Sequence, residues 1–294
     1  LKITLYFRDN RSGNYSIEQI FRAIGNELSE QHEIALFYVD GNKSKWHNLW
    51  QAWKAQGDIN HVTGDVNWLV YGLNPFKTVL TIHDLGHFET TLKGFKKWIY
   101  ALFWIYGPLL WVRSITIISD FTRSRIIRLL PVVKNKVSVI HNPLDPAFKT
   151  DGHIQKQTRT RILQVGSMAN KNADRLIEAT KSLPVELVLL RKPDKTIEKK
   201  MEAYQIRYEW HYDLDQEDVV YLYRSAGILF FASTYEGFGM PIIEAQSVGL
   251  PVITSNSCSM PEVAGKGAHF VDPYSIEEIR EGILKIMYED RYRN

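Results

Sequence analysis

Two glutamates flank a glycine-rich turn in the stretch 236–244, EGFGMPIIE, and this segment is the one best suited to chemistry. An apolar run at 227–232 predicts a strand before the turn, and Pro241 suits the first position of a helix after it. The two glycines would let the backbone approach a ligand closely. Backbone N–H groups at such a helix start favour an anion such as a phosphate, and the two carboxylates could accept hydrogen bonds from sugar and ribose hydroxyls. A glycine turn with an ordinary charge near a helix start is the simpler alternative.

Cations follow two other predicted strands. Lys171 stands shortly after the strand at 161–166, and Arg191 and Lys192 directly follow the strand at 185–190. Because the carboxyl ends of parallel strands meet at one edge of a sheet, these cations should lie opposite the glycine-rich turn, where they could balance a diphosphate. Solvated surface cations are the alternative interpretation.

The first half of the chain adds a histidine and a glycine loop. His83 closes the predicted strand at 78–83 and should face a cleft, although a buried structural histidine is the other explanation. His83, Asp84 and His87 could suggest a metal site, but no third ligand stands at a convincing spacing, so no metal site is expected. The loop around Gly13 could admit a phosphate or sugar, but it lacks the G-x-G-x-x-G spacing of nicotinamide and flavin sites.

Strand-like and helix-like segments alternate over nearly the whole chain, which predicts an α/β architecture with doubly wound parallel sheets. The length of 294 residues suits two domains, and the polar segment 144–160 separates them. We therefore expect one domain over 1–150 and a second over 151–294, facing each other across a ligand-binding cleft. The expected strands are 3–7, 33–39, 78–83, 114–119, 136–141, 161–166, 185–190, 227–232, 251–255 and 268–271.

Composition narrows the functional class. A hydrophobic fraction of 45% is enough for buried cores and excludes a disordered chain. The single cysteine, Cys258, cannot form an intrachain disulfide and favours a reducing, cytoplasmic compartment. The net charge of +3 is too small to indicate a nucleic-acid partner.

One segment is both aromatic and basic. Residues 98–112 form a 15-residue apolar stretch broken by a Gly-Pro pair, which is too short to span a bilayer. Between 93 and 136 there are nine basic residues and one acidic residue. Such a segment suits peripheral docking on an anionic membrane, but a buried core helix with a basic rim is the alternative. The docking candidates are Lys96, Lys97, Trp98, Trp104 and Trp111.

These motifs together resemble a known family. The E-x7-E block at 236–244, its continuation through 249–253 and 261–263, and the segments 81–88, 114–126, 139–148 and 165–179 are similar to those of the retaining glycosyltransferases of family 4, which have the GT-B fold of two Rossmann-like domains. The likeness extends over about residues 1 to 290.

The resemblance implies that the second domain binds a nucleotide-diphosphate sugar and the first binds a glycan or glycolipid acceptor, with no metal or other cofactor. Glu244 would hold the ribose, Glu236 the donor sugar, and Lys171 the diphosphate, while His83 would lie near the transferred sugar. The expected catalytic residues are Glu236, His83 and Lys171, and the expected donor-binding residues are Gly13, Gly166, Ser167, Lys171, Arg191, Lys192, Tyr212, Gly237, Phe238, Gly239, Met240 and Glu244.

The chain also departs from the family pattern. Many members carry an arginine about five residues before the conserved lysine, where this chain has Gly166-Ser167, so Arg191 or Lys192 is expected to supply that cation. The usual C-terminal helices are not present by Asn294, so a C-terminal truncation is expected.

The resulting hypothesis is a hexosyltransferase that acts in polysaccharide or lipopolysaccharide biosynthesis, peripherally on the inner face of the cytoplasmic membrane. A GT-B sugar-nucleotide epimerase and a non-catalytic nucleotide-sugar-binding protein are the alternatives.

Overall fold

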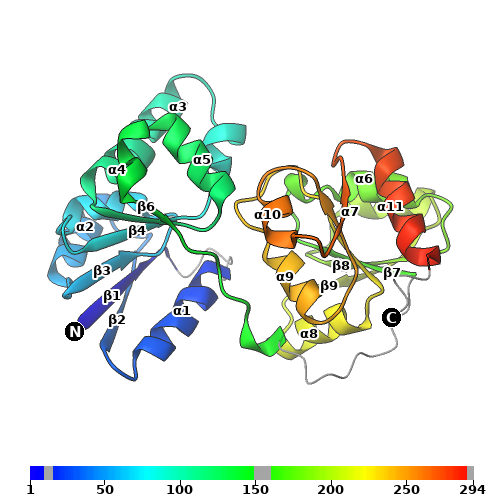
Figure 1. The fold of residues 1–294 in the computed structure, drawn as a ribbon, viewed down its shortest axis with the longest axis horizontal. Coiled ribbons are helices and arrows are strands. Elements are labelled where there is room, and N and C mark those ends of the chain that lie inside the picture. The colour runs from blue at the N-terminus through cyan, green and yellow to red at the C-terminus, as the bar shows by residue number, and fades with distance from the viewer. Residues whose placement is uncertain (10–15, 149–159, 290–294) are drawn as a thin grey trace. The chain divides into compact units, whose positions relative to one another are not determined.

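The computed structural model describes residues 1–9, 16–148 and 160–289, and for Ser16 the backbone only. The chain divides into two compact units, Leu1–Pro143 and Leu144–Asn294 (Figure 1). The division lies at the start of the polar segment 144–160. It is a few residues before residue 150, where the first domain was expected to end.

The first unit is built on a parallel sheet with the strand order β2-β1-β3-β4-β5-β6. Two apolar clusters cover its two faces: α1 packs on Ile3, Leu5 and Phe7, and α2 with the 3-10 and π-helical segments packs on the side of Tyr6 and Leu80. The strands are β1 (Lys2–Phe7), β2 (Glu33–Tyr38), β3 (Ile59–Val62), β4 (Thr78–Ile82), β5 (Ser114–Ile117) and β6 (Val137–Val139). The helical elements are α1 (Ser16–Leu28), α2 (Lys45–Lys54), η2 (Asn67–Gly72), η3 (His87–Thr91), α3 (Gly94–Tyr100), η4 (Ala101–Tyr106), α4 (Gly107–Trp111), α5 (Asp120–Leu129) and η5 (Pro131–Lys136).

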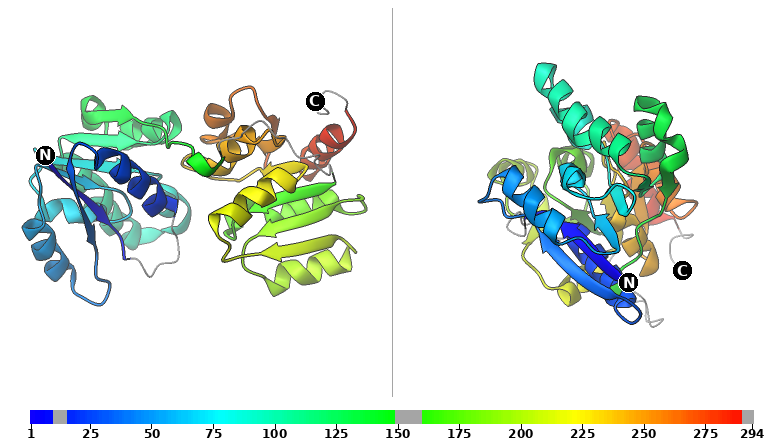
Figure 2. Two further views of the ribbon diagram at one scale, coloured as in Figure 1. Left: turned by 90° about the horizontal axis from the view of Figure 1, so that it is seen from below. Right: turned by 90° about the vertical axis from the view of Figure 1, so that its left-hand side faces the viewer.

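The second unit repeats this plan with the strand order β12-β11-β10-β7-β8-β9 and helices on both faces of the sheet (Figures 1 and 2). The strands are β7 (Arg161–Val165), β8 (Glu186–Leu190), β9 (Arg207–His211), β10 (Ile228–Phe231), β11 (Val252–Ser255) and β12 (His269–Val271). The helical elements are η6 (Pro146–Phe148), η7 (Ala169–Lys171), α6 (Ala173–Thr180), α7 (Lys195–Ala203), α8 (Gln216–Ser225), α9 (Met240–Ser247), α10 (Met260–Ala264) and α11 (Ile276–Tyr288).

Both sheets contain a point at which the chain reverses its direction of winding. In the second unit the chain moves outward from β7 through β8 to β9, then returns to place β10 on the other side of β7. The loops after β7 and β10 therefore diverge at the carboxyl edge, which is where open α/β sheets bind ligands. In the first unit the corresponding point lies between β1 and β3.

The two doubly wound sheets confirm the predicted fold class. Strand β3 was not predicted, because the polar residues Asn60 and His61 interrupt its apolar pattern; in the structure Asn60 is fully buried and accepts a hydrogen bond from the Tyr6 hydroxyl at 3.2 Å. None of the helices in the described ranges is long and apolar enough to cross a membrane.

Candidate functional site

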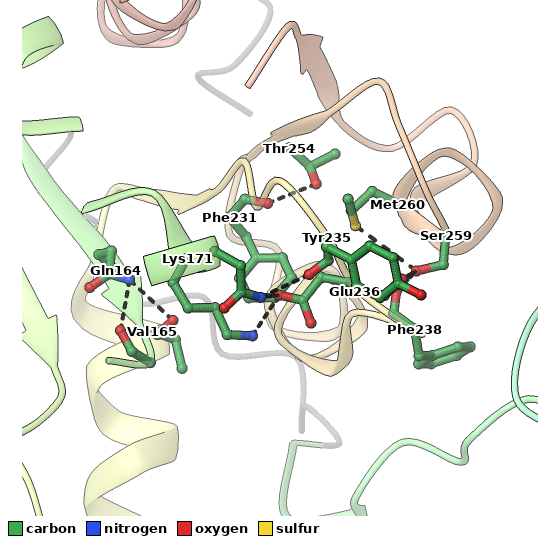
Figure 3. Close-up of polar contacts among 12 residues, drawn as sticks. Gln164, Val165, Lys171, Phe231, Tyr235, Glu236, Phe238, Thr254, Ser259 and Met260 are labelled. Atoms are coloured by element: carbon green, nitrogen blue, oxygen red, sulfur yellow. Dashed lines mark hydrogen bonds and ion pairs between the residues drawn. The ribbon is translucent and has the colours of Figure 1, made fainter. Parts of the chain in front are cut away.

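A short ion pair joins the loops that follow β7 and β10. The Lys171 ammonium Nζ lies 2.6 Å from Glu236 Oε1, and the two side chains point toward each other (Figure 3). The Asn170 amide donates to the Tyr235 carbonyl at 2.8 Å and lies 3.3 Å from the same Glu236 oxygen. The side chains of Lys171 and Glu236 are only 19% and 14% exposed, so the pair is shielded from much of the solvent. The structure thus brings together two of the three predicted catalytic residues.

The loop after β7 has a backbone that fixes Lys171. Gly166 has φ +94°, and a Cβ atom there would lie 3.1 Å from Lys171 Cγ and Cε. Asn172 is in the left-handed conformation, with φ 63°, and its buried amide donates to the carbonyls of Ala232, at 3.0 Å, and Pro273, at 2.6 Å. These bonds anchor the loop to the end of β10. Asn172 was missed by sequence reasoning, although asparagine is a residue that tolerates this conformation.

The loop after β10 is held in a similar way. The buried Ser259 hydroxyl contacts the carbonyl oxygens of Phe238 at 2.7 Å and Glu236 at 3.0 Å (Figure 3). Gly239, with φ +118°, precedes the first residue of α9, Met240, and no described side chain caps this helix. An uncapped N-terminus beside a lysine is a setting that favours an anionic ligand.

Glu244, one turn inside α9, has an unusual environment. The Tyr223 hydroxyl donates to Glu244 Oε2 at 2.6 Å. Burial raises the pKa of Glu244 to about 7, and burial also raises the pKa of Tyr223. Near neutral pH this carboxyl therefore exchanges between an acid and a carboxylate that can accept hydrogen bonds.

The other cations are placed differently. The Arg191 side chain is buried, only 6% exposed, and pairs with Asp194 at 3.5 Å, while Asp194 caps α7 by accepting from the backbone N–H of Thr196. Arg191 thus braces the turn between β8 and α7. Lys192 is exposed, as is Ser167. Tyr212, directly after β9, is 49% exposed and remains a candidate contact for a ligand.

In the first unit, His83 follows β4 and is held in one tautomer. Its Nε2 lies 2.6 Å from the Thr63 carbonyl oxygen, which can only accept, so Nε2 carries the hydrogen and Nδ1 is a free acceptor on the neutral ring. Burial lowers the pKa of His83, which keeps the ring neutral near pH 7. A Cβ on Gly64 would lie 2.4 Å from the His83 ring, so glycine is required there.

Polar residues surround His83 at the same sheet edge. A small cavity of about 60 Å³ is lined by His83 with Asp65, Asp84 and Tyr100, among others. Arg8, after β1, pairs with Glu18 at 2.7 Å and also with Asp65. Sequence reasoning missed Arg8 and Asp65, because nothing in their local pattern indicates that β1 and β3 are neighbours.

Two predicted features have limited structural support. Gly13 lies outside the described residues, so the structure does not place it. Within the described ranges, no group of three or more His, Cys, Asp or Glu side chains could hold a metal ion. That the reaction needs no metal stays a prediction.

The predicted docking residues divide into two groups. Lys96 is exposed and Trp98 is 70% exposed, whereas Lys97 lies over the Phe88 ring at 4.6 Å. Trp111 is 46% exposed and donates through Nε1 to the Leu73 carbonyl at 3.3 Å. Trp104 is half-buried against the core, where it stacks on Tyr100. Trp104 therefore packs inward, and Phe95, which is 77% exposed, is a better docking candidate.

We predict that Gly166→Ala destabilises the second unit by about 1–3 kcal/mol, because alanine is strained at φ +94° and its methyl group would push on Lys171. Gly265→Ala is the matched control, since Gly265 also has a positive φ, +55°, but open space where a Cβ would lie. Urea unfolding would compare the two variants. An equal loss in both would mean that the contact with Lys171 contributes nothing.

Comparison with known proteins places these features in a family. Residues 148–294 match the family model described as glycosyl transferases group 1, and residues 20–148 match the one described as glycosyltransferase family 4. The chain is 29% identical over 273 residues to O-antigen chain mannosyltransferase B of Escherichia coli. This match covers 84% of this chain and 70% of that protein.

Solved structures agree on the fold. Anabaena HepE, in complex with UDP and glucose, has a TM-score of 0.77 at 14% identity and covers 98% of this chain and 91% of its own. WaaG, a glycosyltransferase involved in lipopolysaccharide biosynthesis, has a TM-score of 0.73 at 16% identity. The match covers 100% of this chain and 92% of WaaG. At these identities the likeness shows the fold, and it confirms the predicted GT-B architecture. The chain therefore belongs to the group 1 glycosyltransferases of family 4.

Proposed function

We propose that this chain is a retaining hexosyltransferase that moves a sugar from a nucleotide-diphosphate donor to a hydroxyl of a polysaccharide or lipid-linked glycan. Its family supports a transferase, and the Escherichia coli relative is named as a mannosyltransferase of an O-antigen chain, so a nucleotide-diphosphate mannose is the first donor to test. The observation that carries the proposal is the Lys171–Glu236 pair beside the uncapped start of α9.

The pair suggests how a donor is recognised. Without a ligand, the Lys171 charge is satisfied by Glu236. A diphosphate carries more negative charge than a single carboxylate, so it would replace Glu236 as the partner of Lys171 and extend toward the N–H groups that begin α9. Glu236, released from the lysine, would then accept hydrogen bonds from the donor sugar.

The same residues would stabilise the transition state. As the bond between the anomeric carbon and the phosphate oxygen breaks, negative charge grows on the diphosphate while the sugar gains oxocarbenium character. In this proposal Lys171 and the dipole of α9 would lie where that charge develops, and no divalent metal would be needed. The acceptor oxygen would bond to the same face of the anomeric carbon and lose its proton to the departing phosphate, which retains the configuration.

Two further residues have supporting roles in the proposal. Glu244 would accept hydrogen bonds from the ribose hydroxyls, as the acidic residue of a dinucleotide-binding fold does. His83, with its bare Nδ1, would accept a hydrogen bond from a hydroxyl of the transferred sugar.

The first unit also supports a membrane-docking proposal. Four apolar side chains on α3 and η4 are 49–77% exposed: Phe95, Trp98, Leu102 and Phe103. With the exposed Lys96 they combine rings for the headgroup boundary with a cation for lipid phosphates. We propose that this surface, called the α3 surface below, places the enzyme on the inner face of the cytoplasmic membrane beside a lipid-linked acceptor.

Neither alternative function is favoured. The family models and the named relatives are those of transferases, not of epimerases. The family model and the named relative likewise support a transferase over a non-catalytic binding protein.

We expect Lys171→Met to lower kcat about 10²–10³-fold, because it removes one preorganised charge from the leaving group. Transfer from nucleotide-diphosphate sugars to glycan acceptors would be followed by mass spectrometry, with the product anomer assigned by NMR. Lys199→Met, at an exposed position on α7, is the control for losing a lysine. A Lys171→Met enzyme that is folded and fully active, or an inverted product, would contradict the proposal.

Donor affinity should depend on pH through Glu244. Its pKa of about 7 means that the carboxylate becomes protonated as the pH falls from 8 to 6. If the carboxylate is the form that binds ribose, affinity for a nucleotide-diphosphate sugar should fall by up to about tenfold over this range. Calorimetry on the wild type and on Glu244→Gln checks this, since the variant should bind more weakly and without the pH dependence. The same pH dependence in both proteins would assign the titration to another group.

The docking proposal predicts that Phe95→Ser combined with Trp98→Ser weakens binding to phosphatidylglycerol vesicles by about tenfold or more, because two exposed rings no longer enter the headgroup boundary. Co-sedimentation measures the effect. Tyr221→Ser, at a position on α8 that is 56% exposed, serves as the control. Equal sedimentation of all three proteins would reject the α3 surface as the docking site.

A further inference from the structure

Helix α2 displays three tryptophans to solvent on one face. Trp46, Trp50 and Trp53 are 82%, 50% and 60% exposed, and they stand at i, i+4 and i+7, so they share a side of the helix. The opposite side of α2 is buried through Asn48 and Ala52. Three large exposed rings on one side of a helix form an apolar patch, and such patches mark sites that bind a ligand or a partner.

These rings form one wall of a groove of about 950 Å³, which we call the tryptophan groove. Phe76, which is 70% exposed, belongs to the segment before β4 that forms another part of the lining. The full lining is Trp46, Leu49, Trp50, Trp53, Gln56, Gly57, Tyr71, Gly72, Leu73, Asn74, Pro75, Phe76 and Lys77. The groove volume is that of a site for a ligand rather than of a packing defect.

The groove lies away from the candidate site of the same unit. Gln56 and Gly57 precede β3 and the segment 74–77 precedes β4, so this part of the groove is at the amino edge of the sheet. His83 follows β4 at the carboxyl edge. The five residues of β4 separate the two edges by roughly 16 Å, at about 3.3 Å per residue.

The walls of the groove are braced before any ligand arrives. The backbone N–H of Asn74 donates to Gln56 Oε1 at 2.7 Å, and the Gln56 amide donates to the Trp53 carbonyl at 3.0 Å. The Lys54 ammonium lies 3.4 Å from the centre of the Trp50 ring, and the Arg113 guanidinium lies 4.6 Å from that of Phe76. These contacts reduce the conformational entropy that the braced parts of the groove lose when a ligand binds.

The rings of the lining suit a polyhydroxylated chain. Lys77 is the one charged residue of the lining, Lys54 and Arg113 lie against two of its rings, and no carboxylate lines the groove, so a cationic ligand is not matched. Tryptophan faces carry negative electrostatic potential and attract weakly positive C–H groups, which the faces of sugar rings present. The groove is open along its length, so an extended chain can lie along the exposed rings.

We propose that the tryptophan groove is a second saccharide-binding site, which holds a remote part of the glycan acceptor while its end reacts elsewhere. The inference rests on the proposed glycosyltransferase function for the identity of the chain it holds. Holding the chain raises the effective concentration of its reacting end, so the groove should favour long acceptors over short ones.

The test measures oligosaccharide binding in the absence of any donor. The probes are the neutral mannotetraose, maltotetraose and cellotetraose, with the acidic tetragalacturonate as a comparison. Calorimetry would compare the wild type, Trp50→Ala combined with Trp53→Ala, and Tyr221→Ala, which removes an exposed aromatic ring outside the groove. We expect at least one probe to bind the wild type and Tyr221→Ala equally, and the groove variant at least about tenfold more weakly.

Several outcomes would overturn the proposal. These are no binding of any probe at about 10 mM, or equal binding by the groove variant. Loss of vesicle binding in the groove variant, with oligosaccharide binding unchanged, would assign the rings to the membrane instead. Should the groove variant fail to fold, the indole N–H resonances of wild-type Trp46, Trp50 and Trp53 must shift with the probe, and unshifted resonances would exclude the groove.

A transfer assay separates this proposal from the proposed function. In the groove variant, KM should rise for a long glycan acceptor and stay unchanged for a short one, with kcat preserved for both. Oligosaccharide binding without any detectable transfer would overturn the proposed function and leave the groove. Transfer with unchanged KM for long acceptors would overturn the groove and leave the function.

Discussion

The arrangement of the second unit depends on one short contact, the ion pair between Lys171 and Glu236. The pair can form because β7 and β10 are neighbours in the sheet although they are far apart in the chain. Each partner belongs to a loop that hydrogen bonds fix. The Asn172 amide anchors the loop of Lys171, and the Ser259 hydroxyl anchors the loop of Glu236. A charge held in place in this way needs little reorganisation when an anion takes over as its partner, which is the physical basis of electrostatic catalysis.

Burial shifts the pKa of one ionisable group in each unit toward its neutral form. It raises the pKa of Glu244 to about 7 and lowers that of His83, so both side chains tend toward their neutral forms. Neutral groups cost less to bury, and each still offers a hydrogen-bond acceptor. The Lys171–Glu236 pair differs from these groups, because a cationic and an anionic side chain contact each other there at 2.6 Å. The charged contact thus marks the place where a charged ligand is expected, and the neutral groups mark places for hydroxyls.

Sequence reasoning located the site better than it located the contacts within it. Lys171 and Glu236 follow apolar runs directly, so their position at a carboxyl edge could be inferred from local pattern. Their mutual contact, the turn of Arg191 toward Asp194 and the bond from Tyr223 to Glu244 depend on long-range packing that no local pattern encodes. Trp104 illustrates a further limit. The segment Ala101–Tyr106 is π-helical, which shifts the faces of the helix relative to the usual period of 3.6 residues, so the direction of this ring could not be read from spacing.

The eight tryptophans of the chain differ in their burial and in their neighbours. Trp104 is half-buried against the core, whereas Trp98 lies on the α3 surface with Lys96 nearby in sequence, and Trp46, Trp50 and Trp53 line the open tryptophan groove. Under the two proposals these aromatic regions of one unit serve different partners. Sugar rings contact the tryptophan faces of the groove, and the rings of the α3 surface enter the headgroup boundary of a bilayer.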